Sequence, residues 1–176
     1  MKLNWRSIFR DFERQGLGIT GNLYRVFDVE PGMEDELGYT SSKKTIHENT
    51  KHPYLDGLQD AEKVSLLKGV YAHELLHQIF TDFEYFERKM TFIPSFERSI
   101  FAVINNVLED AAIEGFAKQV MGGTLLSSLE YSIAYIYSKS PNLEVSSSAF
   151  GQYISALINF GDMGPLKGNF TSPEAR

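Results

Sequence analysis

The stretch Ala72-His73-Glu74-Leu75-Leu76-His77 lies inside a segment whose apolar residues have helical spacing, so it is expected on an α-helix. In an α-helix, residues four apart share one face, so His73 and His77 can both reach a single ion. Glu74 can approach a water molecule at that ion without binding the ion itself. Two histidines and a neighbouring carboxylate are the minimal equipment of a catalytic zinc site. The stretch therefore predicts a Zn²⁺ site with Glu74 as general base.

A catalytic zinc site needs a third protein ligand. The metzincin spacing requires a glycine at position 80 and a histidine at position 83, but the chain has Phe80 and Phe83 there. That class is excluded, and no histidine follows His77 in the sequence. The third ligand is therefore expected to be a carboxylate from another helix, or else His47 or His52 upstream.

The best source of that carboxylate is the segment 96–121, which is apolar almost all round and is expected to form a buried helix. A carboxylate in such a helix is costly unless it is paired or binds a metal. Glu109 and Asp110 are the two candidates. Glu109 has the longer reach, whereas Asp110 is followed four residues later by Glu114, which can orient a ligating histidine. The sequence leaves both open. The alternative to a metal ligand is a helix N-cap contact or a buried ion pair with Arg98 or Lys118.

The rest of the chain predicts further helices and a small sheet. Strands are expected at Leu23–Val29 and around Thr45–His47. One helix is expected at 3–15, ended by Gly16 and Gly18, and two more at about 125–139 and 148–160. The helix that carries the motif is expected to begin at an N-cap at Asp60 and to reach about Phe83 or further. The aromatic run from Phe80 to Phe86 is expected in the core. The fold class is therefore α+β and α-dominated, with a small N-terminal sheet, a motif-bearing helix and a following helical bundle.

Composition narrows the class of protein further. The 176 residues suit one domain, expected to span residues 1–160, with 161–176 as a flexible tail or the start of a linker to a missing C-terminal part. A formal net charge of −6 argues against nucleic acid as a partner, although a small basic patch remains possible. Cysteine is absent, which excludes disulfides and thiolate metal sites. No uncharged apolar stretch has the length of a membrane span, so a cytoplasmic protein without a membrane partner is expected.

Three motifs together resemble a known family. They are Ala72-His-Glu-Leu-Leu-His77, Ile79-Phe-Thr-Asp-Phe83 and Asn106-Val-Leu-Glu-Asp-Ala-Ala-Ile-Glu114. The pattern is similar to the gluzincin type of zincin metallopeptidase, of which thermolysin is the familiar example. It resembles more closely the bacterial and phage metallopeptidase domains that precede von Willebrand factor A-type domains in cobaltochelatase-like proteins. The usual arginine two places after the Glu-Asp pair is Ala112 here, and the chain contains no A-type domain.

The resemblance implies a zincin-like fold and a zinc-dependent metallopeptidase acting on peptide or protein substrates, with an A-type domain in the full-length protein. In zincins an edge strand before the motif helix pairs with extended substrate, a role expected here for Thr45–Glu48. Candidate donors to the oxyanion are Tyr39, His47, His52 and Tyr54. The alternative is a non-catalytic, zinc-containing binding module in a larger chelatase-like or mobile-element assembly. A toxin that cleaves one host protein is not separated from a general peptidase by these residues.

Overall fold

The computed structural model describes residues 3–139, 142, 148–158 and 168–172. Across these residues the chain forms mostly helices with one three-stranded sheet, which confirms the predicted α-dominated α+β class. The elements, in chain order, are α1 (Trp5–Thr20), β1 (Arg25–Asp28), β2 (Gly38–Ser41), β3 (Thr45–Glu48), a 3-10 turn (Pro53–Leu55), α2 (Asp60–Phe80), α3 (Phe83–Phe92), α4 (Arg98–Val120), α5 (Gly123–Lys139) and α6 (Ala149–Ile158). Helices α5 and α6 lie where the sequence predicts them.

Helix α1 continues through the two glycines that the sequence predicts as its end. Gly16 is a buried residue of the helix. Any larger side chain at this position would collide with the ring hydroxyl of Tyr71 on α2. The helix ends instead at Gly21, which has a φ of 68° and the left-handed conformation typical of a helix C-terminus. The predicted end is therefore wrong: Gly16 allows α1 to pack closely on α2.

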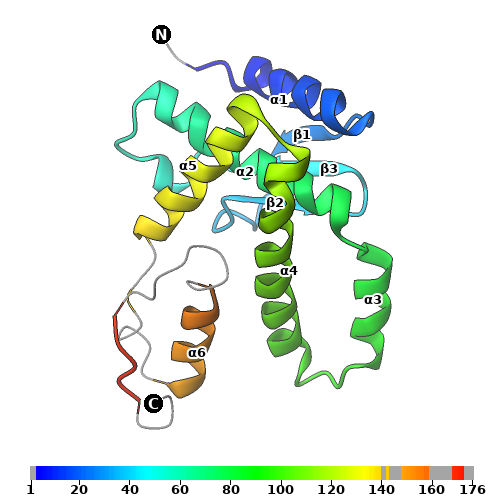
Figure 1. Cartoon of the computed structure of the whole chain (residues 1–176), viewed down its shortest axis with the longest axis vertical. Helices are drawn as coiled ribbons and strands as arrows, with labels where there is room; N and C mark the ends of the chain where they lie inside the picture. The colour runs from blue at the N-terminus through cyan, green and yellow to red at the C-terminus, as the bar shows by residue number, and fades with distance from the viewer. Residues whose placement is uncertain (1–2, 140–141, 143–147, 159–167, 173–176) are drawn as a thin grey trace.

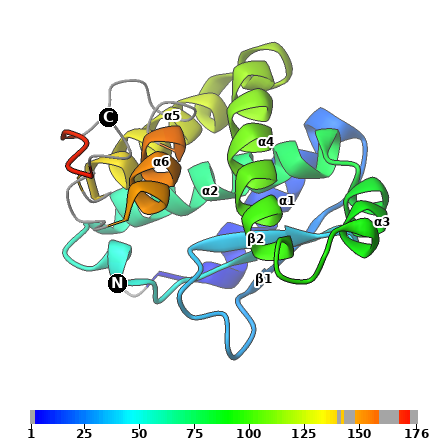
Figure 2. The same cartoon turned by 90° about the horizontal axis from the view of Figure 1, so that it is seen from below.

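The sheet has the strand order β1-β3-β2, with β1 parallel and β2 antiparallel to β3. Strands β1 and β3 match the prediction, but β2 is not predicted as a strand because its sequence, Gly-Tyr-Thr-Ser, has no alternation of apolar residues. The expected edge position of Thr45–Glu48 is wrong. This strand is central and paired on both sides, and the two edge strands are β1 and β2. Of these two, β2 is the one that makes the more extensive contact with α2 (Figure 2).

Helix α2 runs through the middle of the molecule and contacts α1, α4, α5 and two strands (Figures 1 and 2). Its N-cap is Gln59, which forms a capping box with Glu62, so the expected cap Asp60 is instead the first helical residue. The helix ends at Phe80 rather than near Phe83. The reason is Asp82, whose side chain accepts a hydrogen bond from the Tyr85 N–H and begins α3.

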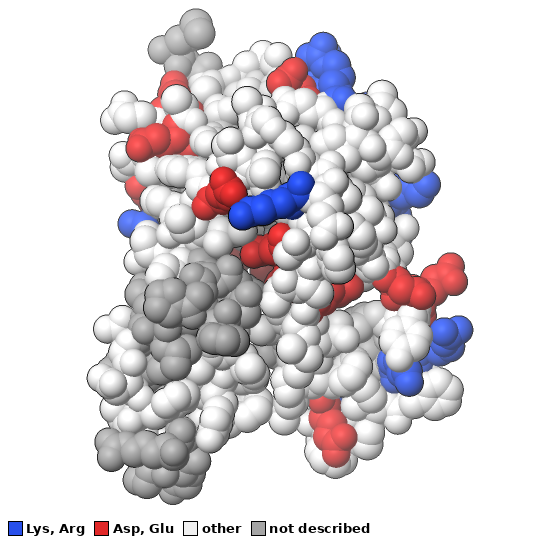
Figure 3. Space-filling view, viewed as in Figure 1, with Lys and Arg blue, Asp and Glu red and all other residues white. Residues whose placement is uncertain are grey.

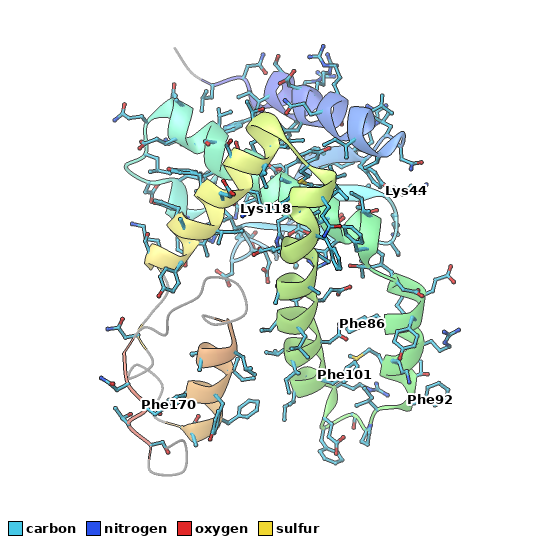
Figure 4. The ribbon with its side chains drawn as sticks, viewed as in Figure 1. Lys44, Phe86, Phe92, Phe101, Lys118 and Phe170 are labelled. Carbon is cyan, nitrogen blue, oxygen red and sulfur yellow. The ribbon has the colours of Figure 1, made fainter. Side chains whose placement is uncertain are left out.

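Helix α3 lies at the surface, and α4 contributes only Ile113 and Ala117 to the hydrophobic core. Figure 1 shows α4 extending away from α2 with α3 beside it, and Phe86 and Phe101 face each other between them (Figure 4). No residue of α3 is buried, and Phe80 is 40% exposed, so the prediction that the aromatic run is core is wrong. The prediction of an all-round buried α4 is also wrong, because α2 and α6 cover only part of its surface.

Of the predicted tail, the structure describes residues 168–172, and the remainder lies outside the described residues. The backbone N–H groups of Thr171 and Ser172 donate to Oε1 of Gln152 on α6, at 3.0 and 3.1 Å. Among the helices described, none combines the length and the apolar character needed to cross a bilayer.

Candidate metal centre

Three ligand atoms converge between α2 and α4. The Nε2 atoms of His73 and His77 lie 3.2 Å apart, one helical turn from each other on the same face of α2. Asp110 approaches them from α4, with its Oδ1 3.0 Å from Nε2 of His77 and 3.6 Å from Nε2 of His73. These three residues form the group that we call the His-Asp cluster.

Each imidazole of the cluster is held through its other ring nitrogen. Nδ1 of His73 lies 3.0 Å from Oε1 of Glu114, and Nδ1 of His77 lies 2.9 Å from the hydroxyl of Thr81. When each Nδ1 carries the ring proton and donates a hydrogen bond to its oxygen partner, each Nε2 keeps a lone pair that points to the centre of the cluster. Glu114 occupies the place that its spacing from Asp110 predicts. Thr81 is not among the residues predicted for the site, although its position four residues after His77 places it on the same helix face.

Oδ1 of Asp110 shows that the cluster suits a cation. It is buried, and among the described residues it has no hydrogen-bond donor. The other oxygen, Oδ2, accepts a hydrogen bond from Asn106 at 2.9 Å. A buried carboxylate oxygen that faces the lone pairs of two imidazole nitrogens is costly, unless a proton or a cation lies between the oxygen and the nitrogens.

The distances within the cluster also suit zinc. Nitrogen and oxygen ligands at about 2.1 Å from a tetrahedral zinc lie about 3.4 Å from one another. The three separations in the cluster are 3.0, 3.2 and 3.6 Å. Two imidazoles and one carboxylate are also a donor set that zinc accepts in sites with an open position. The residues present therefore fit a zinc ion.

The charges around the cluster set its protonation. Burial lowers the pKa of His73, but the carboxylates of Asp110 and Glu114 outweigh burial and raise this pKa well above its ordinary value. Burial raises the pKa of Asp110, and the two histidines overcome this effect and lower it to about 2. Asp110 is therefore ionised at neutral pH, and a proton on His73 competes with a metal ion for the cluster.

Glu74 is buried beside the first histidine and lines the same cavity as the cluster. Burial raises its pKa, while His73 and His77 partly counteract the rise. A carboxyl group with a raised pKa next to metal ligands is suited to accept a proton and to return it.

A cavity of about 690 Å³ opens onto the cluster. Its polar wall is β2, from Gly38 to Thr40. Its apolar wall comes from α3 and α4 and includes Phe83, Phe86, Val103 and Val107. The two histidines of the cluster therefore line a space with one backbone edge and one hydrophobic side.

The structure separates the two candidate carboxylates of α4. Asp110 belongs to the His-Asp cluster, whereas Glu109 lines the cavity without being one of the three convergent donors. The basic residues of α4 do not take Asp110 as a partner. Arg98 donates to the carbonyl of Ile93 at 3.0 Å, and Lys118 is exposed near the C-terminal end of α4 (Figure 4).

Of the four expected oxyanion donors, Tyr39 lines the cavity and the other three do not. The ring of Tyr39 stacks on that of His47 at 4.6 Å. Nδ1 of His52 accepts a hydrogen bond from the backbone N–H of Tyr54, 3.1 Å away. Neither upstream histidine is part of the cluster, so neither takes the place of the third ligand.

Strand β2 directs part of its backbone toward the cavity. The carbonyl of Glu48 on β3 accepts from Val29, next to β1, so Glu48 does not hydrogen-bond to its antiparallel partner Gly38. Because hydrogen-bonded and non-bonded pairs alternate, the N–H and C=O groups of Gly38 and Thr40 point away from β3. Both residues line the cavity.

Gln78 ties this edge strand to the motif helix. Its Nε2 donates to the Thr40 hydroxyl at 2.5 Å and to the Ser41 carbonyl at 2.7 Å. Gln78 directly follows His77, so the position of β2 is fixed relative to the cluster. This residue was not predicted, because its role depends on a strand that the sequence does not reveal.

Comparison of the chain with protein-family models, with curated proteins and with solved structures found no match. What the site can do therefore follows from the geometry of its own residues.

Proposed function

We propose that this chain is a zinc-dependent metallopeptidase. The observation that supports it most strongly is the buried Oδ1 of Asp110, which has no hydrogen bond within the described part of the chain and lies 3.0 and 3.6 Å from the Nε2 atoms of His77 and His73. These three residues would hold the zinc ion. Zinc, when bound, supplies a Lewis acid that polarises a peptide carbonyl and makes water a better nucleophile.

Glu74 carries the proton transfers of the proposed reaction. Its carboxylate takes a proton from the attacking water as the bond between water oxygen and carbonyl carbon forms. It then gives that proton to the nitrogen that leaves when the C–N bond breaks. One water is consumed, and one carboxylate and one ammonium group are produced.

Strand β2 is the proposed docking edge for the substrate, in place of Thr45–Glu48. The outward N–H and C=O groups of Gly38 and Thr40 can pair with an extended peptide as one further strand. Gln78 holds this edge beside the cluster. A peptide bound in this way lies along the cavity, with the cluster next to its backbone.

A peptide-library digestion with the zinc-loaded chain tests this function. We expect cleavage by the natural sequence, and a loss of at least ~100-fold in Glu74→Gln with zinc still bound, because glutamine keeps the shape of the side chain but cannot accept the proton. Glu130→Gln, a matched change at an exposed position of α5, should cleave normally. Zinc binding without any cleavage would refute the peptidase and favour a non-catalytic zinc-containing module. Full activity in Glu74→Gln would exclude Glu74 as the base.

A further inference from the structure

A second cavity lies at the opposite edge of the sheet, between α1 and β1, with a volume of about 500 Å³. It shares no lining residue with the cavity at the His-Asp cluster, which lies beside β2. We call it the α1–β1 groove, and define it by Trp5, Arg6, Arg10, Glu13, Arg25 and Phe27.

Three arginines line the α1–β1 groove although the chain has a net charge of −6. Arg6 and Arg10 are exposed and lie one turn apart on α1, and no carboxylate among the described residues forms an ion pair with either of them. Arg25 faces them from β1, with one guanidinium nitrogen 3.5 Å from Oε2 of Glu13. Guanidinium groups without a partner offer the paired N–H donors that phosphate oxygens accept.

The groove also offers ring surfaces and hydrogen-bond acceptors. Trp5 lines it from α1, and Phe27, which is 48% exposed, lines it from β1. Trp5 is half-buried against Phe9, whereas Phe27 is exposed. Accessible aromatic rings next to arginines favour a flat ring as ligand. Glu13 and Asp28 accept hydrogen bonds from the Val26 and Thr50 backbones, at 3.1 and 3.2 Å. Each carboxylate keeps lone pairs that can accept hydrogen bonds from the hydroxyl groups of a sugar.

We propose that the α1–β1 groove binds a mononucleotide. Arg6 and Arg10 hold the phosphate, Trp5 and Phe27 contact the base, and Glu13 accepts from the ribose. The volume lies within the range of about 300–1,000 Å³ that is usual for small-ligand sites. The net charge of −6 disfavours a long nucleic acid, and the face drawn in Figure 3 shows, outside its grey atoms, separate basic side chains.

Trp5 makes the proposal directly testable, because it is the only tryptophan of the chain. Titration of the metal-free chain with ADP should change Trp5 fluorescence in a saturable way. The double variant Arg6→Gln, Arg10→Gln should weaken ADP binding at least ~10-fold, since both phosphate contacts are lost. Arg14→Gln is the matched control: this arginine lies on the same helix, pairs with Asp11 and does not line the groove. It should bind ADP as the natural sequence does.

Several results would overturn the proposal. One is the absence of a saturable change at millimolar ADP, and another is equal ADP affinity in the double variant. Inorganic phosphate that competes as well as ADP would show that the rings contribute nothing, and would overturn recognition of the base. Far-UV circular dichroism of each variant separates lost binding from lost folding. Because no step needs zinc or hydrolysis, the outcome is independent of the proposed peptidase.

Discussion

The contact between Glu114 and His73 leads to a quantitative prediction about metal affinity. Glu114→Gln keeps the shape of the side chain but removes the charge that orients the imidazole through its Nδ1, 3.0 Å away. Loss of such an outer partner typically weakens metal binding 10- to 100-fold, or about 1.4–2.8 kcal/mol. Only 22% of the His73 side chain and 13% of the Glu114 side chain are exposed, so water screens this contact weakly. We therefore expect a loss in the upper half of that range.

Competition against a chromophoric zinc chelator measures this affinity. The titration belongs near pH 8, because the raised pKa of His73 makes protons compete with zinc at lower pH. Glu109→Gln is the control, since Glu109 lies on the same helix and lines the same cavity without touching a histidine of the cluster. Equal zinc affinity in Glu114→Gln and the natural sequence would refute the orienting role. An equal loss in both variants would show a general charge effect instead.

Two further predictions concern packing and the edge strand. Gly69→Ala should destabilise the chain by about 1–3 kcal/mol, because its methyl group would overlap the Ser128 carbonyl on α5, whereas Gly115→Ala, with open space around it, should stabilise by up to about 1 kcal/mol. The midpoint of thermal unfolding, followed by circular dichroism, should fall for Gly69→Ala and rise for Gly115→Ala, and a Gly69→Ala variant as stable as the natural sequence would contradict the close approach of α5 to α2. Gln78→Leu removes both hydrogen bonds to β2, so KM for a cleaved peptide should rise several-fold while zinc affinity is unchanged. An unchanged KM would exclude Gln78 as a positioning residue.

Features that depend on local periodicity could be predicted from the sequence. His73 and His77 share a helix face through their spacing alone, and the same rule places Glu114 one turn after Asp110. The α-dominated fold class follows from segments whose apolar spacing is helical over many residues. These inferences need only one helix at a time, so no knowledge of the tertiary arrangement is required.

Features that depend on how the elements pack could not be predicted in the same way. The preference for Asp110 over Glu109 arises from the rotation of α4 relative to α2, which neighbouring residues in one sequence do not specify. Gly16 has the local signature of a helix end, yet close packing against Tyr71 keeps it inside α1. The exposure of α4 likewise depends on which elements cover it rather than on its own hydrophobicity.

The zinc content of the purified chain decides whether the His-Asp cluster is a metal centre. Metal-free protein is dialysed against zinc, separated from free metal, and analysed for zinc per chain. We expect a single zinc ion per chain in the natural sequence and in Glu109→Ala, and none in His73→Ala, His77→Ala or Asp110→Ala. A natural chain that holds no zinc, or an Asp110→Ala variant that holds it as tightly as the natural chain, would contradict the His-Asp cluster as a metal centre.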